Sequence, residues 1–203
     1  MSNSVSGIRL RIRADLVRLS AGVCGAIAGL ALVGWHFRFE PFIRVLPWMV
    51  PMVYNTALCL LAGSLGLLWC RTGKPRLSFR TGVFIVTVAA LTLVEYAVPI
   101  NLGIDQFIVR DFLKGALPVP GRMSPHVALS FLVLGAALIL HSLSWRKGPL
   151  MAAWAGVGGV ALAAHGLMHL LTQMAAMVGL AGWALFMAMA LPTALAFTCA
   201  GIG

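Results

Sequence analysis

The stretch PLMAAWAGVGGVALAA, Pro149–Ala164, contains no charged side chain, and SAGVCGAIAGLALVGW, Ser20–Trp35, is equally apolar. Neither stretch shows the alternation of apolar and polar residues that is typical of a membrane β-strand. A continuous apolar run crosses the hydrocarbon core, roughly 30 Å thick, as a helix, because a helix satisfies its own backbone polar groups. The two stretches therefore predict an all-α integral membrane protein.

Composition extends this prediction to the whole chain. Of the 203 residues, 61% are apolar and 10% are charged, and the mean hydropathy is +0.97, well above that of a soluble domain. Uncharged stretches and turn residues predict six transmembrane helices in one membrane domain, residues 17–203, preceded by a basic N-terminus, residues 1–18. The expected helices are at about 17–35, 52–69, 81–99, 125–141, 149–169 and 187–203.

The net charge of +10 would indicate nucleic acid as the partner of a soluble protein. Here the basic residues fall at helix ends, and ten of the fifteen lie in segments 1–18, 70–80 and 142–148. Basic segments stay on the cytoplasmic side, so both termini are expected in the cytoplasm. The partner predicted by this distribution is a lipid bilayer, which the chain crosses several times, and no nucleic acid is expected.

A short motif occurs three times, at Met52–Leu58, Met123–Leu129 and Met189–Leu195. The shared pattern is Met-x-x-[Asn/His/Pro]-[Thr/Val]-Ala-Leu, and the copies are 71 and 66 residues apart. Each copy begins an even-numbered helix, so the repeating unit is a helical hairpin whose orientation is preserved. We therefore expect three parallel hairpin repeats, at about 17–70, 80–141 and 149–203.

Several motifs resemble the N-terminal multi-pass (MASE-like) membrane sensory region of bacterial sensor histidine kinases and diguanylate cyclases. They are NTALCLLAG at 55–63, Glu95-Tyr96 followed by NLGIDQ at 101–106, PGRMSP at 120–125, and PTAL at 192–195. The resemblance implies a non-enzymatic input region, acting as a homodimer, that signals to a kinase or cyclic-dinucleotide domain beyond residue 203. His126 departs from the pattern, which usually has Asn at that position.

Four of the five histidines are expected toward the outer face of the membrane: His36, His126, His165 and His169. His165 and His169 are one helical turn apart on the same face. Neutral imidazoles bind zinc or copper, and imidazoles from two facing helices can hold a haem iron. These residues predict a cofactor site, with haem b favoured through pairing with His36 or His126, and with hydrogen-bonded packing as the alternative.

Methionines near the end of the fifth segment support a copper alternative. Met168 lies beside His169, and Met174 and Met177 follow it. Thioethers favour copper(I), although methionine also fills apolar cores. The alternative metal site comprises His165, His169 and Met168.

Glu95 is an acid at membrane depth, which is costly unless the charge is paired. Its candidate partners are Arg38, Arg44 and Arg122. Together with Tyr96, Asp105 and Arg122 it predicts a polar site, which is either a structural salt bridge or a proton- or ligand-linked site. Residues 37–43 and 104–108 are expected as short amphipathic helices near this site.

No catalytic motif is present, because the sequence has no Ser/His/Asp pattern, no phosphate-binding glycine loop and no CxxC. The leading hypothesis is a membrane sensory input module that binds a cofactor, a small ligand or a redox signal in its outer half. One alternative is a b-type haem electron carrier, although only His141 is available near the inner face for a second haem. The other is a small parallel-repeat transporter, which would need a polar path through the bundle.

Overall fold

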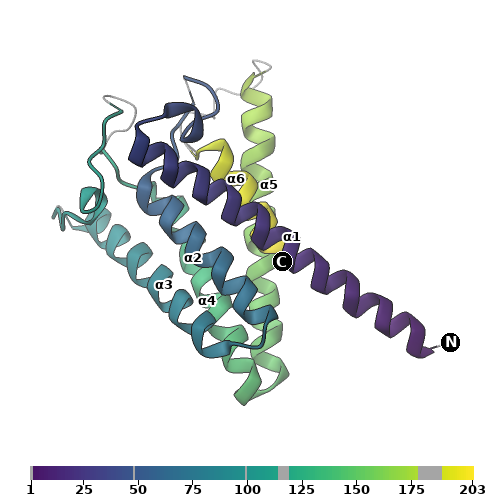
Figure 1. The fold of residues 1–203 in the computed structure, drawn as a ribbon. Coiled ribbons are helices and arrows are strands. Elements are labelled where there is room, and N and C mark those ends of the chain that lie inside the picture. The colour runs from purple at the N-terminus through teal and green to yellow at the C-terminus, as the bar shows by residue number, and fades with distance from the viewer. Residues whose placement is uncertain (1, 48, 99, 114–118, 178–188) are drawn as a thin grey trace.

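The computed structural model describes residues 2–47, 49–98, 100–113, 119–177 and 189–203. These residues form α-helices and two 3-10 turns and contain no strand, which confirms the all-helical prediction. The elements are α1 (Ser2–Phe37), η1 (Glu40–Phe42), α2 (Tyr54–Arg71), α3 (Pro75–Ala97), η2 (Ile104–Gln106), α4 (Pro125–Lys147), α5 (Pro149–Met177) and α6 (Leu191–Ile202) (Figure 1).

Four helices are long and apolar enough to cross a membrane, and their spans are Asp15–Phe37, Pro75–Ala97, Pro125–Trp145 and Pro149–Ala175. The helix α1 also continues through the basic N-terminus, beginning at Ser2. The remaining helices, α2 and α6, are shorter, with 18 and 12 residues.

Proline and glycine explain where several helices begin and end. α3, α4 and α5 start at Pro75, Pro125 and Pro149, where the missing N–H of proline costs nothing. Gly73 and Gly148 have φ angles of 68° and 90°, which glycine adopts without strain. They allow the tight turns between α2 and α3 and between α4 and α5.

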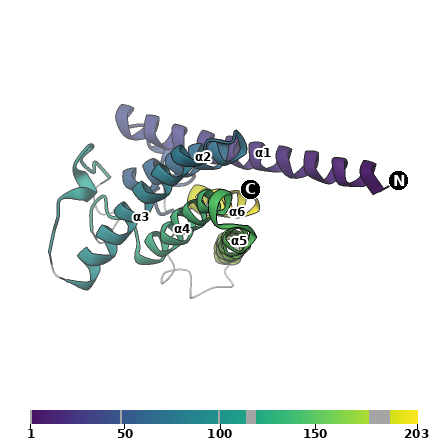
Figure 2. The same ribbon diagram turned by 90° about the horizontal axis from the view of Figure 1, so that it is seen from below.

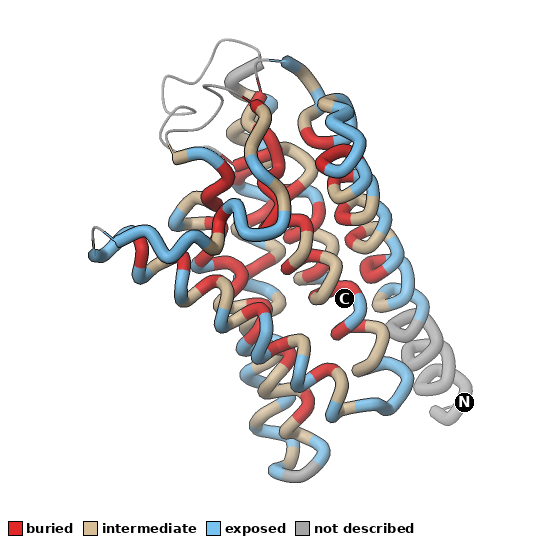
Figure 3. Tube along the Cα trace, turned by 60° about the vertical axis from the view of Figure 1, so that its left-hand side comes forward, coloured by how far each residue is buried: buried red, intermediate tan, exposed pale blue. Residues whose placement is uncertain are grey.

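The helices form an inner and an outer set. α2, α4 and α6 contact one another, whereas α1, α3 and α5 each pack against two of these central helices (Figures 1 and 2). Each central helix contributes a fully buried alanine, and Figure 3 shows the buried positions along the interior. These residues are Ala57, Ala128 and Ala194.

The three central helices also begin alike. Each starts two residues after a methionine that is 1% exposed, and the residue before each helix is extended, with ψ of 157°, 154° and 136°. The methionines are Met52, Met123 and Met189. All three copies of the motif therefore have the same local backbone at what we call the long-loop end, where α2, α4 and α6 begin.

Residues 37–43 and 104–108 do not form the amphipathic helices expected from their sequence. Each region contains only a single 3-10 turn, η1 or η2. Arg38 has a φ of 54° and Gly103 a φ of 73°, and such left-handed residues interrupt a helix. The chain therefore turns back onto the bundle immediately before each 3-10 turn.

α3 and α4 approach each other at backbone distance. A Cβ atom on Gly82 would lie 2.8 Å from the Gly135 carbonyl oxygen, and one on Gly135 would lie 2.7 Å from a Val86 methyl. Small residues permit such close packing between membrane helices. The glycine pair fixes how α3 lies on α4.

Replacing Gly135 by Val is expected to lower the free energy of unfolding by about 1–3 kcal/mol, because the added methyl groups overpack this contact. Unfolding of the detergent-purified protein measures the effect. Gly29→Val is the matched control, because nothing lies within 4 Å of a Cβ at that position. Equal losses in the two variants would contradict the role of the α3–α4 contact.

Candidate functional site

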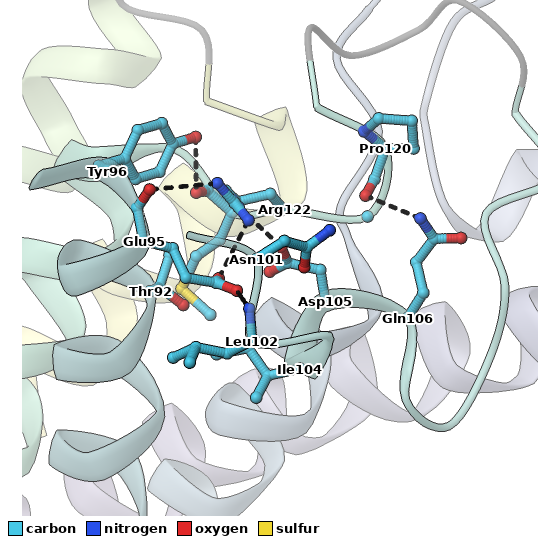
Figure 4. Close-up of polar contacts among 12 residues, drawn as sticks. Thr92, Glu95, Tyr96, Asn101, Leu102, Ile104, Asp105, Gln106, Pro120 and Arg122 are labelled. Atoms are coloured by element: carbon cyan, nitrogen blue, oxygen red, sulfur yellow. Dashed lines mark hydrogen bonds and ion pairs between the residues drawn. The ribbon is translucent and has the colours of Figure 1, made fainter. Parts of the chain in front are cut away.

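A buried ion-pair cluster surrounds Arg122 at the long-loop end (Figure 4). The Arg122 Nε donates a hydrogen bond of 2.6 Å to Asp105 Oδ2, and its Nη2 lies 3.3 Å from Glu95 Oε2. Glu95, Asp105 and Arg122 are only 4%, 6% and 9% exposed. One guanidinium therefore faces two buried carboxylates.

Three different elements supply these side chains. Glu95 lies in the last turn of α3, Asp105 in η2, and Arg122 shortly before α4. A turn at Gly121, with φ of 74°, brings Arg122 to η2, and a Cβ there would lie 2.8 Å from the Asp105 carbonyl oxygen. Only glycine fits this approach without strain.

Backbone contacts attach the same segment to α3 and α2. The Leu102 N–H donates to Glu95 Oε1 over 2.6 Å, and the Asn55 side-chain amide donates to the Ile104 carbonyl over 3.0 Å. We call residues 100–113 and 119–122 the latch segment. These contacts hold the latch segment to the bundle, partly through Glu95.

Tyr96 completes the cluster. Its ring centroid lies 5.5 Å from Arg122 Cζ, and its hydroxyl donates to the Met123 carbonyl over 3.2 Å. The structure therefore brings together all four residues that the sequence assigned to a polar site. Of the three candidate arginines, Arg122 is the partner of Glu95, whereas Arg44 pairs with Glu40.

The cluster carries an imbalance of charge. Burial raises the pKa of the Asp105 carboxyl, the hydrogen bond from Arg122 acts in the opposite direction, and the charge of Glu95 adds to the rise. Among the described residues, Glu95 Oε2 and Asp105 Oδ1 are buried and have no hydrogen-bond partner. Buried polar atoms are rarely left in this state.

A second cluster consists of His126, His165 and His169. The ring centroids of His165 and His169 are 4.6 Å apart, those of His126 and His169 are 5.1 Å apart, and those of His126 and His165 are 6.3 Å apart. α4 and α5 supply these rings, which gather at the long-loop end.

Local packing explains why His169 points inward. A Cβ on Gly166 would lie 2.6 Å from the Thr198 nitrogen and 2.7 Å from the Ala194 carbonyl oxygen, so α5 lies directly on α6. His169 is 1% exposed. The Nε2 atoms of His165 and His169 are buried with no hydrogen-bond partner in the described part of the chain, whereas His126 Nε2 lies 3.3 Å from Ser124 Oγ.

One residue predicted for this site, His36, lies apart from it. His36 is exposed at the end of α1, with its Nδ1 2.9 Å from the Leu32 carbonyl and its ring 5.8 Å from that of Tyr54. Met168 is 44% exposed, and Met174 is 62% exposed. The imidazole cluster therefore forms without His36, and the side chains of Met168 and Met174 are largely exposed, while the side chain of Met177 lies outside the described residues.

A cavity of about 310 Å³ lies between the two clusters. Tyr96 and Arg122 border it on one side and His126 on another, together with three methionines that the sequence analysis assigned only to the repeat: Met52, Met123 and Met189. The repeat itself was the signal that these three would converge. A larger cavity of about 950 Å³, at the opposite end of the bundle, is mostly apolar and includes His141.

The imidazole cluster suits a small ion better than a haem. The His169 ring lies within 5.1 Å of both other rings, in the space that a porphyrin between them would need. Two buried nitrogens without partners are suitable ligands for zinc or copper. Within the described residues, no group of three or more His, Cys, Asp or Glu side chains is placed so that it could hold a metal ion.

Comparison with known proteins finds no matching family model, no matching curated protein and no matching solved structure.

Proposed function

We propose that this chain is a membrane sensory input module whose imidazole cluster binds a zinc or copper ion. The observation that carries the proposal is the contact among His126, His165 and His169, with two buried Nε2 atoms that have no partner among the described residues. Unsatisfied buried nitrogens are costly, and an ion would satisfy them. The bound ion, or its redox state, would be the stimulus.

The architecture that we propose for this module is six transmembrane helices in three parallel hairpin repeats, with both termini in the cytoplasm. The similar starts of α2, α4 and α6 support the repeat, and the basic residues at the opposite helix ends support the orientation. The resemblance to MASE-like regions supports a homodimer in the bacterial inner membrane that signals through α6 to a cytoplasmic kinase or cyclic-dinucleotide domain.

The geometry also favours this function over the alternatives. An electron carrier would need haem, and the His169 ring lies 5.1 Å from the His126 ring and 4.6 Å from the His165 ring, in the space that a porphyrin bound to those two would need. A transporter would need a polar path, and the described residues that border the larger cavity are mostly apolar.

Metal binding by the detergent-purified protein tests the proposal. After chelator treatment, titration with Zn²⁺ or Cu²⁺ is expected to give one bound ion per chain. His169→Ala is expected to weaken binding by at least about 100-fold, since losing even an outer partner of a ligand costs about 10–100-fold. His36→Ala and His141→Ala are the controls, because both histidines lie outside the cluster. Binding that survives His169→Ala and His126→Ala unchanged would disprove the site.

A further inference from the structure

We propose that Glu95 and Asp105 hold one proton between them, and that this shared proton keeps the latch segment attached to α3. The site would make the module sensitive to pH at the long-loop end. This inference concerns the Arg122 cluster alone and does not depend on metal binding at the histidines.

The first argument is the count of charges. Within the described part of the chain, two carboxylates and one guanidinium are buried together, which leaves one negative charge without a described partner. Among the described residues, the groups that face these carboxylates are Arg122 and the Tyr96 ring, and the contact from α2, through Asn55, is neutral. When two carboxylates share a site, one of them keeps its proton to a higher pH.

The second argument is the pattern of hydrogen bonds. Glu95 Oε1 accepts from the Leu102 N–H and Asp105 Oδ2 accepts from Arg122 Nε. Glu95 Oε2 is near Arg122 Nη2, at 3.3 Å, but makes no hydrogen bond, and Asp105 Oδ1 has no partner among the described residues. A carboxylic acid donates one hydrogen bond, so a single proton would supply the missing donor and remove the excess charge.

A metal cation is a poorer occupant than a proton. Calcium and magnesium require six or more oxygen ligands, whereas only two carboxylate oxygens are free in the described part of this cluster. The Arg122 guanidinium would also repel a cation at this distance.

The direction of the pH effect follows from the bound proton. The proton stabilises the attached latch segment fully at low pH, and this stabilisation is lost as the pH rises through the raised pKa of the Asp105 carboxyl. Above that pKa, two buried carboxylates repel each other and only one guanidinium holds them. The latch segment is then expected to loosen from α3.

Infrared titration of the purified chain in detergent tests the proposal directly. From about pH 5 to about pH 9, a range above the ordinary carboxyl pKa, the wild type is expected to lose a protonated carboxyl band, and its thermal midpoint to fall by about 2–4 °C. Glu95→Gln and Asp105→Asn should abolish both changes, because each amide can donate the missing hydrogen bond without a titrating proton. Glu40→Gln, which removes a half-exposed acid paired with Arg44, should retain both.

Either of two results would overturn the inference. One is a wild-type protein with no protonated carboxyl band at about pH 5, measured above the ordinary carboxyl pKa. The other is a band that persists in both Glu95→Gln and Asp105→Asn. The infrared titration of the wild type decides the matter even if a variant fails to fold, and metal binding at the histidines is measured separately.

Discussion

Replacing Arg122 by Gln is expected to lower the free energy of unfolding by about 3–5 kcal/mol, the usual cost of removing one partner from a buried ion pair. The substitution leaves Glu95 and Asp105 buried without a cation. It also removes the positive charge beside the Tyr96 ring. Because Arg122 joins the latch segment to both Glu95 and Asp105, the damage should extend to the attachment of the latch segment.

Denaturant unfolding in a fixed detergent measures this effect, and Arg44→Gln is the control. Arg44 pairs with Glu40, whose side chain is 45% exposed, and pairs of this kind contribute about 0–1 kcal/mol. The loss in free energy of unfolding for Arg122→Lys should lie between those of the two Gln variants, because an ammonium keeps the charge but lacks the planar fork that reaches two carboxylates. If Arg122→Gln and Arg44→Gln proved equally mild, the buried cluster would not stabilise the fold.

Replacing Trp35 by Ala is expected to lower the free energy of unfolding by about 3–5 kcal/mol, the second large effect. Trp35 is 2% exposed and its ring meets Phe112 edge-on, with the centroids 5.2 Å apart. Its indole N–H donates to the Met52 carbonyl over 2.8 Å. Truncation would open a cavity among Ile43, Tyr54 and Leu113 and leave that carbonyl without its donor.

Two further variants separate packing from hydrogen bonding. Trp35→Phe keeps most of the ring and should cost less, since the lost hydrogen bond itself contributes about 0.5–1.5 kcal/mol. Trp154→Ala removes a tryptophan that is 57% exposed, so the free energy of unfolding should hardly change. Comparable losses in Trp35→Ala and Trp154→Ala would show that burial at Trp35 contributes little.

The sequence predicted the helices well because apolar length and proline are local signals. The expected segment 125–141 begins at Pro125, as α4 does. The expected segment 81–99 begins later than α3, which starts at Pro75. The start was predicted too far along the chain because of the charged residues near Arg80, although a helix tolerates charges where it leaves the apolar layer.

Side-chain direction was harder to predict than depth. His36 and His126 were expected at similar depths, but His36 lies on α1, which packs against α2 and α6, whereas the cluster forms between α4 and α5. Likewise, Arg122 could be chosen over Arg38 only through the turn at Gly121. Which helices become neighbours is a property of the tertiary fold, and a single sequence does not reveal it.

The contact between Gly82 and Gly135 makes α3 and α4 a single rigid unit, because backbones this close cannot slide or rotate separately without collision. Glu95, Arg122 and His126 all lie near the same end of this unit, the long-loop end. A change in how the latch segment is attached would therefore take place beside His126, so the two proposed sites would act on the same end of this unit.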